Sequence, residues 1–148
     1  MPASSPLSKF QRRVLSDALR LVRDQRRRAE ADDEAHLAPE AAWPTPFGLG
    51  YLLGAVDGLC QAHGVPFDGT ALAIYGLVLD DTFGRPDSDA FRRQGVTLMQ
   101  AGDPDFGRGR AWGGNEAMGM AQGAEPIGLV HLARGDERWM GGPQEAAG

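Results

Sequence analysis

Three glycines recur at intervals of four residues inside the most apolar segment of this chain. Gly50, Gly54 and Gly58 lie in the stretch FGLGYLLGAVDGLCQAHG, whose leucines repeat at helical spacing. A glycine inside a helix costs roughly 1 kcal/mol relative to alanine, so a stripe of three needs a structural reason. The reason that we expect is a second backbone segment packed closely against the stripe. The spacing therefore predicts a central helix over residues 46–63 with a glycine groove on one face.

Capping and helix-breaking residues predict further helices on both sides of this segment. Serine, threonine, asparagine and aspartate favour helix starts, whereas glycine and proline favour helix ends. The expected caps are Ser8, Thr45, Asp68, either Asp87 or Ser88, and Asn115. The expected helices span residues 9–31, 46–63, 69–83, 90–101, 115–122 and 126–134. No window alternates apolar and polar residues for long enough to predict a strand. We therefore expect an all-α fold, a compact bundle of five to six short helices around the glycine-striped helix.

The segment before Asn115 is rich in glycine and shows no periodic pattern. Residues 102–114 read GDPDFGRGRAWGG, with five glycines and one proline. Such composition is typical of a loop, and long loops inside a compact domain are frequently functional or mobile. We therefore expect a long loop over residues 102–114.

Arginines and glycines together make this predicted loop the most suggestive binding site. Two arginines flank the glycines, and backbone amides at the expected helix start would attract an anion. Asp57 is a carboxylate inside the apolar central helix, so it needs a partner if it is buried, such as an arginine of the first helix or of the loop. The candidate ligand-binding residues are Arg108, Arg110, Gly113, Gly114, Asn115 and Asp57. The alternative is a structural loop held by Phe106 and Trp112, because the chain has no phosphate-loop signature.

Positive charge is concentrated at the start of the chain. Residues 1–28 carry eight basic and two acidic side chains, a net charge of +6, whereas the remainder carries seven arginines and eighteen carboxylates, a net charge of −11. Such asymmetry favours contact between a basic helix and an acidic surface, either of the same chain or of a partner. The candidate partner-binding residues are Arg12, Arg13, Arg20, Arg23, Arg26, Arg27 and Arg28.

Apolar residues of the same helix form a stripe that is wider than one buried face requires. Phe10, Val14 and Ala18 recur at helical spacing, and Leu15 and Leu19 widen the stripe. We therefore favour homo-oligomerisation, for example a homodimer, through residues 9–31. Nucleic-acid binding is less favoured, because a body at −11 would repel a duplex.

Two groups of residues resemble metal or catalytic sites only in part. Cys60 and His63 are spaced to share one helix face, but the chain has no second ligand pair of that kind. The carboxylates between residues 80 and 89 lack the twelve-residue calcium-loop pattern, so helix capping and a solvated acidic surface explain them better. The acidic residues in question are Asp80, Asp81, Asp87 and Asp89. We expect no catalytic residue, no metal site and no cofactor.

Composition and order along the chain predict one cytoplasmic domain. The single cysteine and the absence of a charged start followed by an apolar run indicate a reducing compartment. The longest uncharged stretch is interrupted by prolines and falls short of the roughly 18 apolar residues that a membrane span needs. We expect a disordered start over residues 1–8, a single domain over 9–135 with its helical core at 45–135, and a flexible tail over 136–148 in which only Trp139 and Met140 are suited to dock.

Three hypotheses on function follow from these features. The first is a small cytoplasmic protein that works as a non-catalytic protein-interaction or self-associating module, in bacterial style. The second is a binding protein for a small anionic ligand, or a small enzyme, that uses residues 106–115. The third is a nucleic-acid-associated regulator that uses the arginine-rich first helix.

Overall fold

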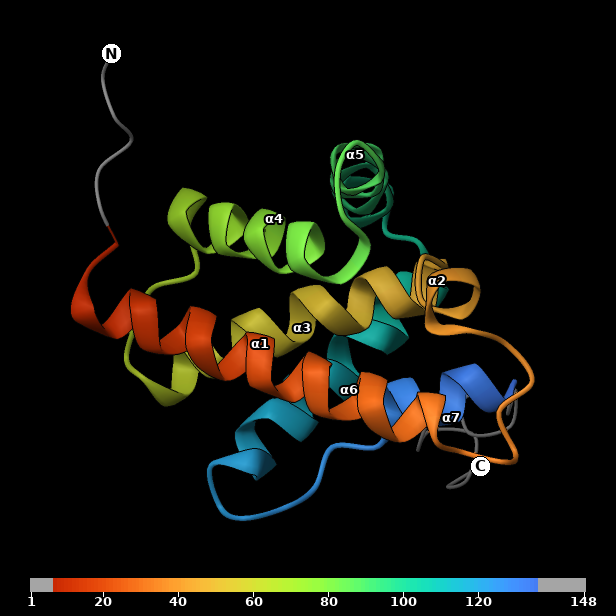
Figure 1. Ribbon diagram of the computed structural model, residues 1–148. Coiled ribbons are helices and arrows are strands. Elements are labelled where there is room, and N and C mark those ends of the chain that lie inside the picture. The colour runs from red at the N-terminus through yellow and green to blue at the C-terminus, as the bar shows by residue number, and fades with distance from the viewer. Residues whose placement is uncertain (1–6, 136–148) are drawn as a thin grey trace, which may run out of the picture.

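The computed structural model describes residues 7–135, and every regular element in this part is a helix (Figure 1). The helices are α1 (Lys9–Glu30), α2 (Pro39–Ala42), α3 (Pro46–Ala62), α4 (Gly69–Phe83), α5 (Asp87–Ala101), α6 (Pro104–Met120) and α7 (Gly128–Arg134). The predicted all-α bundle is confirmed, with the short α2 as an additional element. Ser8 caps α1 by accepting a hydrogen bond from the Gln11 amide. Our expectations for residues 1–6 and for the tail, including Trp139 and Met140, concern residues outside the described part.

Helix α3 is the centre of the fold, as its sequence predicts. Thr45 accepts a hydrogen bond of 3.2 Å from the Gly48 amide, and Pro46 occupies the first helical position. Every residue from Phe47 to Cys60 is buried except Asp57. Helices α1, α4, α5, α6 and α7 all contact α3, so it is enclosed on most of its circumference (Figure 1).

The glycine stripe of α3 lies directly against the backbone of α6. A Cβ atom built on Gly50 would lie under 3.0 Å from the carbonyl oxygen of Phe106, and one built on Gly54 would lie as close to that of Arg110. Gly58 meets the following turn of α6 in the same way. Because successive turns meet in the same order, the two helices run in the same direction. The expected second backbone segment is confirmed, and α6 provides it.

Helix α6 contributes a glycine stripe of its own to this contact. Cβ atoms on Gly109 and Gly113 would lie under 3.0 Å from the carbonyl oxygens of Phe47 and Tyr51. The absence of side chains on both helices therefore lets two backbones approach closely along most of their length. Dispersion contacts between the paired helices offset the intrinsic cost of glycine.

The prediction of a loop over residues 102–114 is wrong, because this segment forms most of α6. Asp103 caps the helix by accepting a hydrogen bond of 3.0 Å from the Phe106 amide, and Pro104 is its first residue. The helix expected to begin at Asn115 is also wrong, since that residue lies within α6. The glycines that suggested a loop are those that contact α3, so tertiary contacts override their intrinsic preference.

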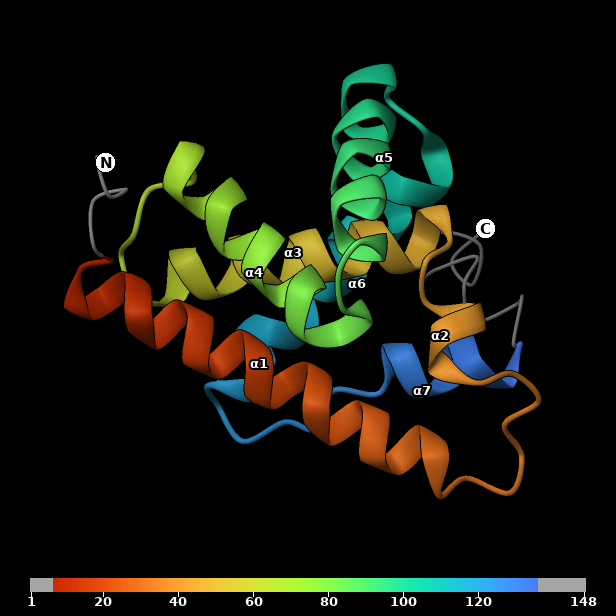
Figure 2. The same ribbon diagram turned by 45° about the horizontal axis from the view of Figure 1, so that its top comes forward.

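Helix α5 projects from the bundle while contacting α3, α4 and α6 (Figure 2). It begins at Asp87, and the expected capping by Asp87 or Ser88 is wrong, because α5 follows Pro86 and has no side-chain cap. The Ser88 hydroxyl instead donates a hydrogen bond of 2.5 Å to Oδ1 of Asp80 on α4. Only Ser88 and Gly95 of α5 are buried, and a Cβ atom on Gly95 would meet the Tyr75 hydroxyl at 2.5 Å.

Helices α2 and α7 close the remaining end of the bundle. Trp43 at the end of α2 is fully buried, and its indole N–H donates to the carbonyl oxygen of Leu129 at 3.0 Å. Helix α7 begins at Gly128, two residues later than predicted, and ends where predicted at Arg134. Among residues 7–135, no helix has the length and apolar character required to cross a membrane.

Candidate functional site

Four of the six predicted ligand-binding residues come together between α3 and α6. Asp57, Arg110, Gly114 and Asn115 line an open depression of about 360 Å³ together with Gln61. The Arg110 guanidinium lies 3.3 Å from the Asp57 carboxylate and 5.1 Å from the centre of the Phe67 ring. The expected pairing of Asp57 with an arginine is therefore confirmed, and the partner is Arg110.

The other two predicted residues lie elsewhere. Arg108 pairs with Asp105, one turn earlier on α6, and Gly113 is buried against α3. Because residues 113–115 lie inside a helix, their amides donate to the preceding turn and do not form the predicted anion cradle. Among the described residues, Arg110 is the one positive group that lines the depression. Asp57 already partly neutralises it, so an anion would have to compete with Asp57 for Arg110.

Three arginines of α1 contact the body of the protein. Arg23 makes a two-pronged contact with Asp81 of α4, with N···O distances of 3.0 and 2.5 Å. Arg26 donates to the carbonyl oxygen of Thr82 at 2.6 Å and lies 5.4 Å from the centre of the Trp43 ring. Arg26 also pairs with Glu40. Arg28 donates to the carbonyl oxygen of Pro126, and its guanidinium lies 3.3 Å from the Glu125 carboxylate. We call Arg23, Arg26 and Arg28 the inner arginines because of their contacts with other elements and not because of burial, since the Arg23 side chain is 56% exposed.

The other four arginines of α1 face solvent along one stripe of the helix. Arg20 and Arg27 pair with acidic residues one turn earlier on α1, and their side chains remain 61% and 72% exposed. Arg13 lies 6.0 Å from the centre of the exposed Phe10 ring, and Arg12 donates to the carbonyl oxygen of Leu7. We call Arg12, Arg13, Arg20 and Arg27 the outer arginines. Lys9 is exposed on the same stripe.

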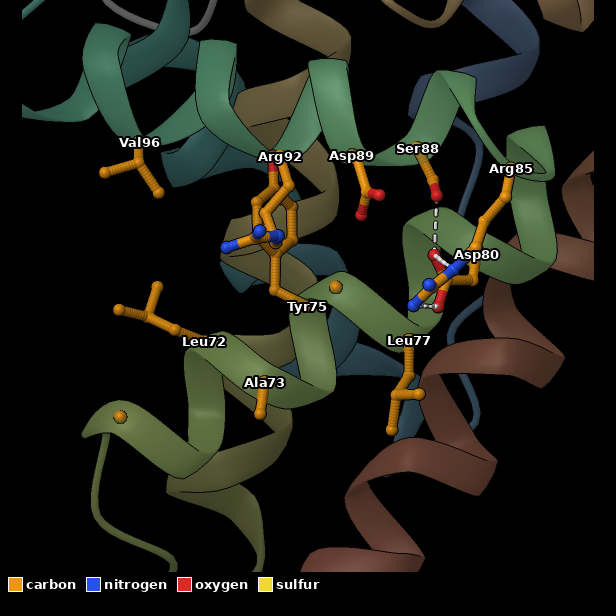
Figure 3. Close-up of a pocket in the computed structure, with 12 residues that line it drawn as sticks. Leu72, Ala73, Tyr75, Leu77, Asp80, Arg85, Ser88, Asp89, Arg92 and Val96 are labelled. Atoms are coloured by element: carbon orange, nitrogen blue, oxygen red, sulfur yellow. Dashed lines mark hydrogen bonds and ion pairs between the residues drawn. The ribbon is translucent and has the colours of Figure 1, made fainter. Parts of the chain in front are cut away.

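A larger groove, of about 440 Å³, lies between α4 and α5. Leu72 of α4 and Val96 of α5 face each other at its open end, and the hydrogen bond between Ser88 and Asp80 lies at its closed end (Figure 3). The hydrogen bond from Ser88, together with the Arg85 guanidinium at 3.3 Å, lowers the pKa of the Asp80 carboxyl below its usual value. No sequence pattern predicted this groove, apart from the sparse apolar residues of α5.

Two carboxylates of the predicted acidic cluster pair with arginines. Asp80 pairs with Arg85, and Asp81 pairs with Arg23 of α1. Across residues 7–135, no group of three or more histidine, cysteine or acidic side chains is arranged to hold a metal ion. Asp80 and Asp81 are therefore engaged in ion pairs with arginines.

Cys60 and His63 do not form a catalytic pair in the described structure. Cys60 is fully buried, and burial, reinforced by the negative charge of Asp57, raises the pKa of its thiol to about 11. Nε2 of His63 lies 3.0 Å from the carboxylate of Asp17 on α1. The thiol therefore lacks both the exposure and the ionisation of a nucleophile.

A buried polar network links α1, α3, α6 and the start of α7. Gln25 donates to the Tyr51 hydroxyl at 3.0 Å, and Tyr51 donates to Glu116 at 2.5 Å. The Glu116 carboxylate accepts from the amides of Ile127 and Gly128, which begin α7. Burial, with the nearby Glu116 charge, raises the pKa of Tyr51 well above its usual value. Sequence reasoning missed this network, although a glutamine on the apolar face of α1 was a signal.

No protein-family model, curated protein or solved structure matches this chain.

Proposed function

We propose that this protein is a non-catalytic binding module that recognises an acidic polypeptide surface through the outer arginines of α1. The observation that carries the proposal is the division of the seven arginines of α1 into two sets. The inner set is engaged with the body of the protein. The outer set lies on one solvent-facing stripe with Lys9 and remains open to a partner.

The ion pairs made by the outer arginines leave them available for binding. Arg20 and Arg27 pair within α1 at the surface, where such pairs contribute only about 0 to 1 kcal/mol. A partner carboxylate would exchange with Asp17 or Asp24 at little cost. Complementary charge would also accelerate the encounter and fix its orientation.

Charge of both signs on the stripe favours a polypeptide over a nucleic acid. Asp17 and Asp24 interrupt the outer arginines and would repel a continuous row of phosphates. The chain beyond residue 28 adds a net charge of −11, which would repel a densely charged duplex more strongly than a polypeptide whose carboxylates are widely spaced. A protein helix with spaced carboxylates is the better match to a basic stripe interrupted by acidic residues.

Self-association through the solvent face of α1 has less support. In an isologous dimer the same patch meets itself, so the outer arginines of two copies would repel each other. Leu15 and Leu19, which suggested a second apolar face, pack against the core of their own chain. Phe10 is the large apolar side chain of α1 that remains exposed, at 52%.

The test is titration of fluorescently labelled poly-L-glutamate with the protein at low ionic strength, measured by anisotropy. Arg20→Glu should weaken binding several-fold, and Arg13→Glu/Arg20→Glu should weaken it further. Arg93→Glu on α5 is the matched control, because it reverses one exposed charge elsewhere and should leave the affinity nearly unchanged. Equal loss in Arg20→Glu and Arg93→Glu, no binding by the wild type, or tighter binding of duplex DNA than of polyglutamate would contradict the proposal.

A second candidate function is binding of a small anion at the depression between α3 and α6. Its support is the convergence of Arg110, Asn115 and Gln61 around one open surface. Phosphate, sulfate or citrate should then raise the Tm of the wild type and not that of Arg110→Ala. A Tm that none of these anions raises would remove this candidate.

A further inference from the structure

The groove between α4 and α5 combines exposed apolar surface with two charged side chains that form no hydrogen bond or close ion pair within the described residues. Leu77 is 43% exposed at its edge, and Leu72 and Val96 are half-buried within it. Asp89 and Arg92 project from α5 on the side of the groove (Figure 3). Within residues 7–135, neither of these two side chains makes a hydrogen bond or an ion pair, and they act on Arg85 and Asp80 only as nearby charges. A partner that covered the groove would bury apolar surface and neutralise both charges.

The charges of the groove make it complementary to itself. It carries Asp80 and Asp89 against Arg85 and Arg92, so its net charge is zero. An isologous interface is favoured by this property, because each charge of one copy can meet an opposite charge in the same patch of the other. Asp89 and Arg92 lie one turn apart on α5, so two antiparallel copies of α5 would place each Asp89 opposite an Arg92.

We propose that a second copy of this chain occupies the groove, forming a symmetric dimer in which α4 and α5 of both copies pack together and Asp89 of each copy pairs with Arg92 of the other. The projection of α5 from the body leaves it accessible to the second copy (Figure 2). The solvent face of α1 has the opposite character, since its net positive charge repels an identical face. The two surfaces are therefore suited to different partners, a second copy at the groove and an acidic protein at α1.

The test is the molar mass in solution, measured by light scattering and sedimentation over a wide range of protein concentration. The wild type should reach twice the mass of the chain as concentration rises. Asp89→Arg and Arg92→Asp should each weaken the dimer on the order of tenfold, because each change places like charges opposite each other. The double variant Asp89→Arg/Arg92→Asp should restore it, since the exchanged charges again meet with opposite sign.

Controls on the same helix separate this interface from a general effect of charge. Asp87 and Arg93 are exposed and do not line the groove, so Asp87→Arg and Arg93→Asp should leave the dimer intact. Leu77→Glu should weaken the dimer, whereas Leu37→Glu, which changes a leucine of similar exposure outside the groove, should not. A monomer at every concentration, single variants without effect, or a double variant that fails to restore the dimer would overturn the proposal.

The outcome is independent of the function proposed for α1. Arg20→Glu should leave the dimer unchanged, and Arg92→Asp should leave the affinity of each chain for polyglutamate nearly unchanged. If Arg20→Glu instead dissociated the dimer, the interface would involve α1 and the proposed groove interface would be wrong.

Discussion

The Tyr51 hydroxyl of α3 donates a hydrogen bond of 2.5 Å to Oε1 of Glu116 on α6. Gln25 of α1 donates to the same hydroxyl, and Glu116 also accepts from two amides at the start of α7. Four segments distant in sequence therefore meet at one buried hydroxyl and one carboxylate. Each polar group in this network forms a hydrogen bond with another, so removal of one side chain leaves a buried donor or acceptor without that hydrogen bond.

Tyr51→Phe should lower the free energy of unfolding by about 2 to 3 kcal/mol. The change leaves the Gln25 side-chain N–H without its acceptor and removes one of the hydrogen bonds that the Glu116 carboxylate accepts. Tyr75→Phe is the matched control, because Tyr75 is also buried but its hydroxyl donates to one backbone carbonyl, that of Leu49. Loss of this hydrogen bond should lower the free energy of unfolding by about 1 kcal/mol. Urea unfolding of both variants measures the difference, and an equal or larger loss in Tyr75→Phe would show that the network adds little.

Gly54→Ala should destabilise the protein by about 3 kcal/mol, since the new methyl group would overlap the backbone of Arg110 and force α3 and α6 apart. Gly107→Ala is the control, because it lies in the same helix as Arg110 but has no atom within 4 Å of the added Cβ. This change should stabilise the protein by about 0.5 to 1 kcal/mol through helix propensity. Thermal unfolding gives both values, and tolerance of alanine at Gly54 would contradict the close contact.

The sequence predicted one side of this glycine contact and missed the other. Gly50, Gly54 and Gly58 stand in an apolar background, so their helical period was visible. Gly109 and Gly113 stand among polar residues and other glycines, which hid the same period. Local propensity favours a loop there, and only the presence of α3 alongside makes the helix stable. A glycine stripe that requires a close neighbour was a signal to search the chain for a complementary stripe.

The pKa of Asp80 is lowered in the folded protein by the Ser88 hydroxyl and the Arg85 guanidinium, so its carboxylate form stabilises the fold. This contribution is present above the ordinary value of 3.8 and is lost as the pH falls through the lower folded pKa. Ser88→Ala should raise the pKa of Asp80 towards 3.8, so the protein should begin to lose stability at a higher pH than the wild type. An NMR titration of the Asp80 carboxyl below pH 5 measures this, and an unchanged pKa in Ser88→Ala would contradict the assignment.

The Cys60 thiol should be almost inert in the native protein. With a pKa of about 11, about one molecule in a thousand carries a thiolate at pH 8, and the side chain is fully buried. Reaction with a disulfide reagent should therefore follow the unfolded fraction as urea is added. Labelling of native protein at the rate of a free thiol would instead indicate an accessible cysteine and reopen a chemical role for it.

The sequence predicted some features of the candidate sites and missed others. Asp57 stood out because a charge in an apolar helix requires a partner, and Arg110 was among the partners expected. The arginines of α1 stood out by composition, but no pattern separates inner from outer arginines until α4 and the segment before α7 are placed beside the helix. The groove between α4 and α5 depends on the angle at which α5 leaves the body, which no local pattern specifies (Figure 2).

Helix α1 uses its inner arginines to hold the fold and, as proposed, presents its outer arginines to a partner. Arg26 and Arg27 are neighbours in sequence and belong to different sets, so Arg26→Ala and Arg27→Ala form a matched pair. The most direct measurement is the Tm of each variant together with its affinity for labelled poly-L-glutamate at low ionic strength.

Arg26→Ala should cost about 2 kcal/mol and lower the Tm by roughly 5 to 8 °C, because it removes contacts with Thr82, Glu40 and the Trp43 ring. The folded protein should keep its affinity. Arg27→Ala should leave the Tm within about 1 °C and weaken binding about twofold to fivefold, since it removes one outer charge and exposes Asp24. An equal fall in Tm for both variants, or an affinity that depends on Arg26 and not on Arg27, would contradict the account.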